Sequence, residues 1–249
     1  MIPFSEPEAR SSSLPVVTLT IIGICCLILL YELVIGGLGV LFGRGSIDIN
    51  VFFLKWGFIP DELTSGVALT GVRTGSGVLD IETPVPTWTT MFTSMFIHGG
   101  FFHIVFNMVF LWVFGGNLEN RLGRFKFLAL YLATGAVAAL SHLAIDPGSQ
   151  TPLVGASGGI AGVLGAYLLT FPYSQIRALI IVWFILQLFQ WGLSMGLPSS
   201  VNIAFVAHIG GFVAGLILIA VYKTLNREPI WPSTTRRNPW DYWYRSNRR

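Results

Sequence analysis

A serine set among glycines and a histidine about fifty residues later are the side chains best suited to chemistry in this sequence. Ser157 lies in the uncharged stretch VGASGGIAGVLGAYLLTF (residues 154–171), and His208 lies in AHIGGFVAG (residues 207–215). A serine hydroxyl becomes a nucleophile when a base takes its proton, and acyl transfer also needs donors for the oxyanion. His208 can be that base, and His103 and Asn107, in HIVFN, can be those donors.

The composition indicates that these residues are positioned by membrane helices. Hydrophobic residues make up 53% of the 249 residues and charged residues 11%, and the mean hydropathy is +0.68. About 20 apolar residues span the roughly 30 Å hydrocarbon core as a helix. The sequence therefore predicts an all-α polytopic membrane protein, a bundle of six transmembrane helices at residues 14–35, 91–114, 127–145, 153–171, 178–193 and 203–222.

Basic residues predict the orientation and the division of the chain. Arg121, Arg124 and Lys126 follow the second span, Arg177 follows the fourth, and further Lys and Arg follow the sixth, whereas acidic residues outnumber basic ones in the first loop. Short loops rich in Lys and Arg stay in the cytoplasm. We expect a cytoplasmic segment at 1–13, a six-helix domain at 14–222 with an external loop at about 36–90, and a basic, aromatic cytoplasmic tail at 223–249.

The start of the chain has no basic region like that of a signal peptide and no resemblance to a transit peptide. The first span is therefore interpreted as an uncleaved helix, and a bacterial plasma membrane as the expected location, with both termini cytoplasmic. Cys25 and Cys26 are neighbours inside that span and indicate nothing about redox compartment.

Small residues explain how polar groups on three spans could meet. Burying an unpaired polar group in hydrocarbon costs several kcal/mol. The four polar side chains named above, Ser157, His208, His103 and Asn107, must therefore contact each other or water. Small-xxx-small patterns allow two helix backbones to approach closely, and close packing of the fourth and sixth spans would bring the Ser157 hydroxyl within about 2.6–3.2 Å of the His208 ring. The pairs are Gly155 and Gly159, Gly158 and Gly162, and Gly211 and Gly215.

The motifs together resemble those of one family. GASGGIAGVLGAY resembles the GxSG motif of rhomboid intramembrane serine proteases, AHIGGFVAG resembles their sixth-helix histidine followed by GxxxG, and HIVFN resembles their second-helix HxxxN. GGNLENRLGR (residues 115–124) is similar to the turn that follows the second helix in that family. The resemblance covers residues 14–222.

The resemblance implies a serine endopeptidase that cuts transmembrane segments of other proteins near their outer end. Ser157 would be the nucleophile and His208 the general base and then acid, without a third carboxylate. His103, Asn107 and the Ser157 backbone N–H would form the oxyanion hole. The sequence departs from the family at Ala161, where rhomboids often carry an aromatic residue that packs on the histidine, and the first loop has no evident Trp–Arg pair.

Other functions are less consistent with these residues. A catalytically silent rhomboid relative that acts in membrane-protein binding or quality control is the alternative: absence of the serine or histidine would indicate it and both are present, whereas Ala161 favours it. A transporter or channel would need polar residues continuing to the inner side of the bundle, where spans two, four and six are apolar. Nucleic-acid binding by the tail is not needed to explain its charges, and no ligand spacing around His98 or His142 supports a metal. We expect no cofactor, no metal and no nucleic acid.

The expected partners are a transmembrane protein substrate and membrane lipid, and the sequence leaves the oligomeric state open. Outside the site, Glu119, Arg121 and Glu32 are interpreted as structural. The fifth span is more polar and aromatic than its neighbours, and in rhomboids that helix borders the route of substrate entry, although ordinary packing explains each residue singly. Its residues of this kind are Trp183, Gln187, Gln190 and Trp191.

Overall fold

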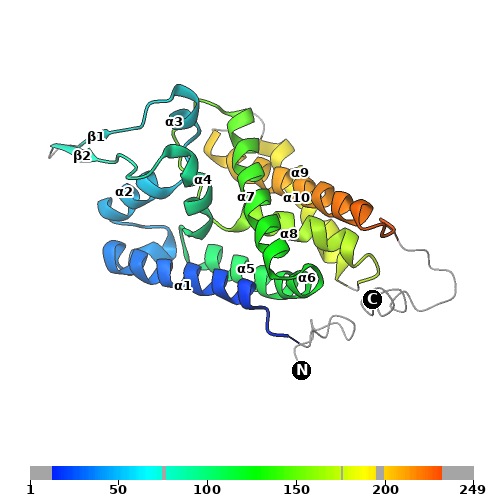
Figure 1. Ribbon diagram of the computed structural model, residues 1–249. Helices are drawn as coiled ribbons and strands as arrows, with labels where there is room; N and C mark the ends of the chain where they lie inside the picture. The colour runs from blue at the N-terminus through cyan, green and yellow to red at the C-terminus, as the bar shows by residue number, and fades with distance from the viewer. Residues whose placement is uncertain (1–12, 75–76, 175, 195–198, 232–249) are drawn as a thin grey trace.

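Long apolar helices make up most of the protein (Figure 1). The computed structural model describes residues 13–74, 77–174, 176–194 and 199–231. Within these residues helix occurs in each of the six predicted spans, and the prediction of an all-α membrane protein is confirmed. The long helices are α1 (Val16–Gly36), α7 (Arg124–Ile145), α8 (Ser157–Thr170), α9 (Arg177–Ser194) and α10 (Ser199–Leu225).

Four stretches of the described residues are long and apolar enough to cross a membrane, namely α1, Phe101–Leu122, α7 and Phe205–Leu225 within α10. The chain is an integral membrane protein. α8 and the described part of α9 are apolar but shorter, so the count of six crossings stays a prediction. The outer parts of the proposed segments 1–13 and 223–249 lie outside the described residues.

The second span differs from the prediction of one helix over residues 91–114. The chain forms α4 (Thr90–Thr93) and the 3₁₀ turn η4 (Ser94–Phe96), then breaks before α5 (Phe101–Phe110). The break falls at Gly99 and Gly100, where Gly100 has extended backbone. The helix then continues through a π turn, η5 (Leu111–Gly115), into α6 (Gly116–Leu122). The residues on both sides of the break are apolar, so hydropathy alone predicted a span that starts about ten residues before the membrane-length stretch Phe101–Leu122.

The fourth span is also shorter than the predicted 153–171. α8 begins at Ser157 itself, because Leu153 pairs with Phe58 as an isolated antiparallel bridge, with N–O distances of 2.8 and 3.0 Å. At about 1.5 Å per residue, 14 residues of helix cover roughly 21 Å, less than the hydrocarbon core. An extended segment therefore leads into the protein before α8 starts. The sixth helix, in contrast, begins earlier than predicted, at Ser199.

α8 lies at the centre of the bundle, and ten of its 14 residues are buried. It packs on α7 and α10, which lie beside it in Figure 1. A Cβ added at Gly211 or Gly215 of α10 would overlap the carbonyl oxygen of Gly158 or Gly162, respectively. The two backbones thus touch directly. A Cβ added at Gly165 of α8 would likewise overlap the carbonyl oxygen of Phe212 in α10, whereas Gly158 and Gly162 face α7 and Gly159 faces Met95 and Tyr131.

Polar contacts fasten the ends of these helices. Glu119 accepts hydrogen bonds from the backbone N–H of Val17 (2.9 Å) and of Thr18 (2.8 Å), so it caps α1. Arg121 forms an ion pair with Glu228 at 2.6 Å. Lys223 donates to the carbonyl oxygen of Leu169 in the last turn of α8 (2.7 Å), which satisfies an orphan carbonyl there.

The region predicted as a long external loop is structured. It contains η2 (Leu38–Phe42), α2 (Ile47–Trp56), α3 (Pro60–Ser65), a hairpin of β1 (Gly71–Thr74) and β2 (Gly77–Asp80) with Gly71 opposite Asp80, and η3 (Thr87–Thr89). The hairpin projects from the body in Figure 1. A 2.7 Å hydrogen bond from Lys55 to Asp80 ties β2 to α2 and lowers the pKa of the Asp80 carboxyl.

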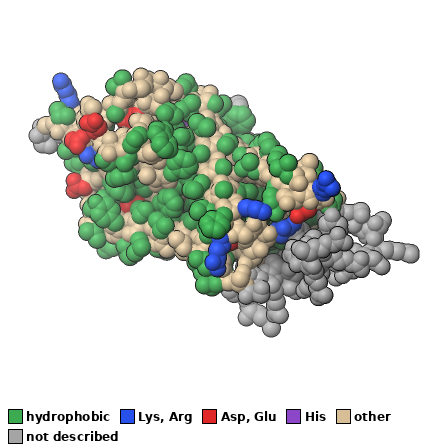
Figure 2. Space-filling model, in the orientation of Figure 1, with side chains coloured by type: hydrophobic (Ala, Val, Ile, Leu, Met, Phe, Trp, Pro, Cys, Tyr) green, Lys and Arg blue, Asp and Glu red, His purple; other side chains and the backbone are tan. Residues whose placement is uncertain are grey.

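Acidic and basic side chains are distributed unevenly between the two ends of the molecule. Figure 2 shows apolar side chains over most of the visible face, basic side chains near the ends of α6 and α10, and both acidic and basic side chains over the loop region with α2 and the hairpin. Arg124, Lys126 and Arg227 are exposed at the basic end. The bridge between Phe58 and Leu153 joins the loop region to the segment before Ser157, so the loop region lies at the end of α8 where Ser157 is.

Candidate active site

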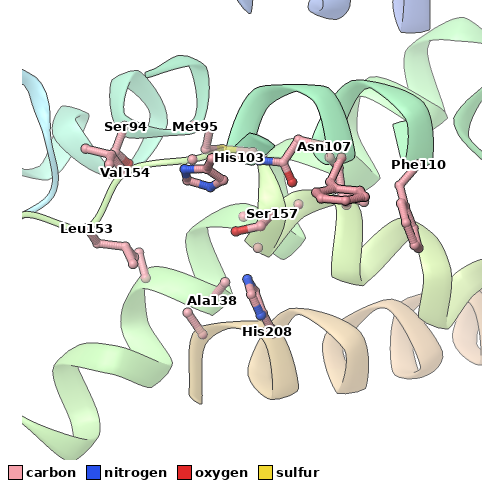
Figure 3. A pocket seen from close by; sticks show the side chains of 18 of the residues that line it. Ser94, Met95, His103, Asn107, Phe110, Ala138, Leu153, Val154, Ser157 and His208 are labelled. Atoms are coloured by element: carbon pink, nitrogen blue, oxygen red, sulfur yellow. The ribbon is translucent and has the colours of Figure 1, made fainter. Parts of the chain in front are cut away.

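A cavity of about 430 Å³ lies where α5, α8 and α10 come together. Its lining includes all four side chains that the sequence singled out: Ser157, His208, His103 and Asn107. Figure 3 shows His208 pointing toward Ser157 from one side, and His103 and Asn107 on the other side of the serine. The lining residues are otherwise mostly apolar, and none of them is acidic.

Ser157 is the first residue of α8, at the end of the extended segment. The backbone N–H of Gly155 donates to the carbonyl of Ser94 at 2.8 Å, which fixes the segment against η4. Gly155 has a φ of 122°, a conformation that side-chain-bearing residues rarely adopt. Because Ser157 starts the helix, its backbone N–H belongs to the first turn, whose N–H groups have no partner within the helix. The positive end of the helix dipole therefore faces the cavity.

His103 and Asn107 lie one turn apart on α5, which begins at Phe101. His103 is therefore in the first turn of its helix and not in the middle of one long helix, as the predicted span 91–114 implied, because the break at Gly99 and Gly100 intervenes. A Cβ on Gly155 would lie 2.6 Å from His103 Nε2, so a larger residue there would require the ring or the segment to shift. Asn107 is 7% exposed, and its Nδ2 is buried without a hydrogen-bond partner in the described part of the chain.

The ring of His208 is held by α9. Its Nδ1 lies 2.8 Å from Oε1 of Gln187, and the ring of Trp183 packs against it with centroids 5.9 Å apart. No hydrogen bond joins the Ser157 hydroxyl to His208 among the described residues, so the predicted contact of about 2.6–3.2 Å is not formed in this state. Hydrogen bonds between catalytic groups are commonly long in unliganded sites and tighten when substrate binds.

The other histidines lie apart from this arrangement or support it. The His98 ring packs edge-on against His103, with centroids 5.2 Å apart, and its backbone N–H donates to Glu32 at 3.1 Å. His142 is buried within α7. Among the described residues, no group of three or more His, Cys, Asp and Glu side chains could hold a metal ion.

Sequence reasoning attributed Gln187 and Trp183 to ordinary packing and did not connect them with His208. The available signal was a glutamine and a tryptophan four residues apart in an apolar span. That spacing places them on one helix face, but only the packing of α9 on α10 shows what that face contacts. Trp183 supplies the ring against the histidine that Ala161, itself fully buried, does not provide.

The fold and the cavity define a helical membrane protein with a serine, two histidines and an asparagine gathered inside its bundle. Comparison with known proteins agrees with this class. The model of the rhomboid domain matches residues 85–224, more than half of the 249 residues. The chain belongs to the rhomboid family.

The relatives include proteins named as proteases and proteins named only as rhomboid-like. The chain is 33% identical over 139 residues to rhomboid protease GluP of Bacillus subtilis (53% of this chain, 26% of the relative). It is 34% identical over 134 residues to RHOMBOID-like protein 5 of Arabidopsis thaliana (51% and 42%). It is 30% identical over 155 residues to the mitochondrial presenilin-associated rhomboid-like protein of Bos taurus (56% and 40%). The chain thus spans less than two thirds of the length of these relatives.

Proposed function

We propose that this protein is an intramembrane serine endopeptidase that cleaves transmembrane segments of other proteins near their outer end, with Ser157 and His208 as its catalytic residues. The observation that carries the proposal is the gathering of Ser157, His208, His103 and Asn107 around one cavity inside a rhomboid bundle. An unpartnered, buried Asn107 amide beside a serine at a helix N-terminus supports an oxyanion site.

The mechanism follows from these positions. As the Ser157 oxygen bonds to the scissile carbonyl carbon, its proton passes to the ring nitrogen of His208 that faces it. The negative carbonyl oxygen is then stabilised by N–H donors from His103, Asn107 and the Ser157 backbone. When the C–N bond breaks, the leaving amine takes the proton from His208, and an acyl-enzyme remains.

Water completes the cycle by the same steps. His208 removes a proton from a water molecule that attacks the ester carbon, and the donors again hold the oxyanion. Collapse returns the proton to Ser157 and releases the new carboxyl end of the substrate. A substrate helix must open to expose its carbonyl, because a helical carbonyl is hydrogen-bonded to its own backbone. A helix-breaking residue near the site should therefore favour cleavage.

The proposal includes an orientation. Basic residues near the ends of α6 and α10 favour a cytoplasmic location for that end, and both termini with it. Ser157 lies at the other end of α8, so water would reach it from the outside. A bacterial plasma membrane is the proposed location.

Cleavage by the purified protein tests the proposal. The protein in detergent is incubated with a single-span substrate that has a helix-breaking residue near its outer end, beside Ser157→Ala and His208→Ala variants. We expect cleavage by the parent alone and labelling of Ser157 by a fluorophosphonate probe. Cleavage that persists in both variants would refute the assignment of Ser157 and His208. A folded parent that neither cleaves nor labels would favour a catalytically silent, membrane-protein-binding relative.

A further inference from the structure

Gln187 is a buried amide in an otherwise apolar and largely exposed helix. Gln187 is 8% exposed, whereas Leu186 and Leu188 beside it are 49% and 40% exposed. Burying an amide without a partner is costly, and the partner present here is the His208 ring, 2.8 Å from Oε1 to Nδ1. The contact joins α9 to α10 through His208, the general base of the proposed reaction.

With Oε1 of Gln187 toward the ring, this contact favours one tautomer of the histidine. A glutamine Oε1 can only accept, so the proton of the neutral imidazole lies on Nδ1. The lone pair is then on Nε2, the nitrogen available to Ser157. When His208 takes the serine proton, the same oxygen faces the N–H of the imidazolium and stabilises its charge.

We propose that Gln187 is a positioning residue for His208 and acts as the third member of a Ser157–His208–Gln187 relay; this inference rests on the proposed function. Its amide oxygen performs the orienting task without a charge. Among the described residues that line the cavity none is acidic, so no carboxylate of theirs competes for Nδ1.

Trp183 completes the support from one turn earlier on the same face of α9. Its ring packs at 5.9 Å from His208 and at 6.3 Å from Phe212, centroid to centroid. It limits tilting of the imidazole, while Gln187 limits rotation and sets the tautomer. Both contacts come from α9, so the base is oriented from a helix that contributes neither the nucleophile nor the base.

The experiment compares Gln187→Met, which removes the acceptor at similar length, with Gln187→Glu, which keeps an acceptor and adds charge. Gln190→Met is the matched control, because Gln190 is exposed on the same helix. Steady-state cleavage across pH is measured for each protein, and ¹⁵N-histidine NMR of the full protein in detergent reports the His208 tautomer, assigned with His208→Ala.

We expect Gln187→Met to lower kcat about 10- to 100-fold with little change in KM, and to abolish the single Nδ1–H tautomer. Gln187→Glu should retain most of the activity and move the acid limb of the kcat profile to higher pH, because a carboxylate favours the imidazolium. Gln190→Met should match the parent. If Gln187→Met fails to fold, the pH shift in Gln187→Glu decides the question.

Unchanged kcat and tautomer in Gln187→Met, or an equal loss in Gln190→Met, would overturn the proposal, as would an unshifted profile in Gln187→Glu. A parent that cleaves nothing but whose His208 tautomer depends on Gln187 would instead refute the proposed protease activity and leave the contact standing. The two failures are thus distinguishable.

Discussion

At the scale of single residues, the cavity holds a polar group that the fold does not satisfy. The Asn107 amide nitrogen is buried, and no described residue accepts its hydrogen bonds. Leaving a buried donor unpaired costs about 1–3 kcal/mol. By contrast, Asn117, ten residues later in the same span, donates to the carbonyl of Val113 at 3.1 Å. A donor kept unpaired beside Ser157 is suited to a charge that exists only during the reaction.

Asn107→Ala should therefore lower kcat by about 10²–10³-fold, the effect of removing one oxyanion donor. The apparent unfolding temperature should stay level or rise, because the variant loses an unpaired buried amide. Peptidase assays and thermal unfolding in the same detergent measure both effects. Asn117→Ala is the control and should cleave as the parent does. Reduced stability with unchanged kcat in Asn107→Ala would assign the residue a structural role instead.

Gly155 is the second residue on which the site geometry depends. Gly155→Ala would place a methyl group 2.6 Å from His103 Nε2 in a backbone of φ 122°, so the ring, the segment or both must shift. Such strained backbone costs about 1–3 kcal/mol. We expect at least a tenfold (about 1.4 kcal/mol) loss of kcat/KM with helix content preserved by circular dichroism. Gly99→Ala, where nothing lies within 4 Å, is the control. Equal activity in the two variants would contradict this account of Gly155.

At the scale of elements, direct backbone contact between α8 and α10 sets the separation of Ser157 from His208. The added methyl of Gly215→Ala would overlap the Gly162 carbonyl, and backbone cannot move aside as a flexible side chain can. Overpacking of this kind costs about 1–3 kcal/mol, and it should also draw the nucleophile and the base apart.

Gly215→Ala should therefore lower the apparent unfolding temperature and the rate of fluorophosphonate labelling of Ser157 together. Gly23→Ala in α1 is the matched control, because nothing lies within 4 Å of Gly23 and alanine favours helix over glycine. Normal stability and labelling in Gly215→Ala would mean that the two helices are not held by this contact.

At the scale of the whole molecule, parts outside the matched rhomboid domain are built into the bundle. The family model begins at residue 85, yet Glu119 within it caps α1, and Leu153 pairs with Phe58. The loop region therefore sits over the end of the bundle that holds Ser157, opposite the basic end. This arrangement gives the proposed orientation a physical basis in the distribution of charge.

The orientation predicts the location of reporters fused to the full chain in bacteria. A reporter fused after residue 249 should be active if it requires the cytoplasm and inactive if it requires the outside of the membrane. One inserted in the loop region, at residues 75–76 between β1 and β2, should be active only if it works outside. The opposite pattern would reverse the proposed topology and place Ser157 at the cytoplasmic side.

The amino-acid sequence by itself determined the class of protein and the set of polar residues. Apolar runs identify membrane helices whatever their neighbours are, and Ser157, His208, His103 and Asn107 are conspicuous because hydrocarbon tolerates few such groups. The small-residue pattern at Gly211 and Gly215 indicated close helix approach for the same local reason.

Only the tertiary structure decided where the helices begin and which residues orient His208, the proposed general base. The segment before Ser157 is apolar but extended, because its backbone pairs with Phe58 and Ser94, residues far away in sequence. Hydropathy cannot distinguish such a segment from helix. The contact of Gln187 with His208 likewise depends on how α9 packs against α10. Both features arise from contacts between distant segments, which no local pattern of residue types encodes.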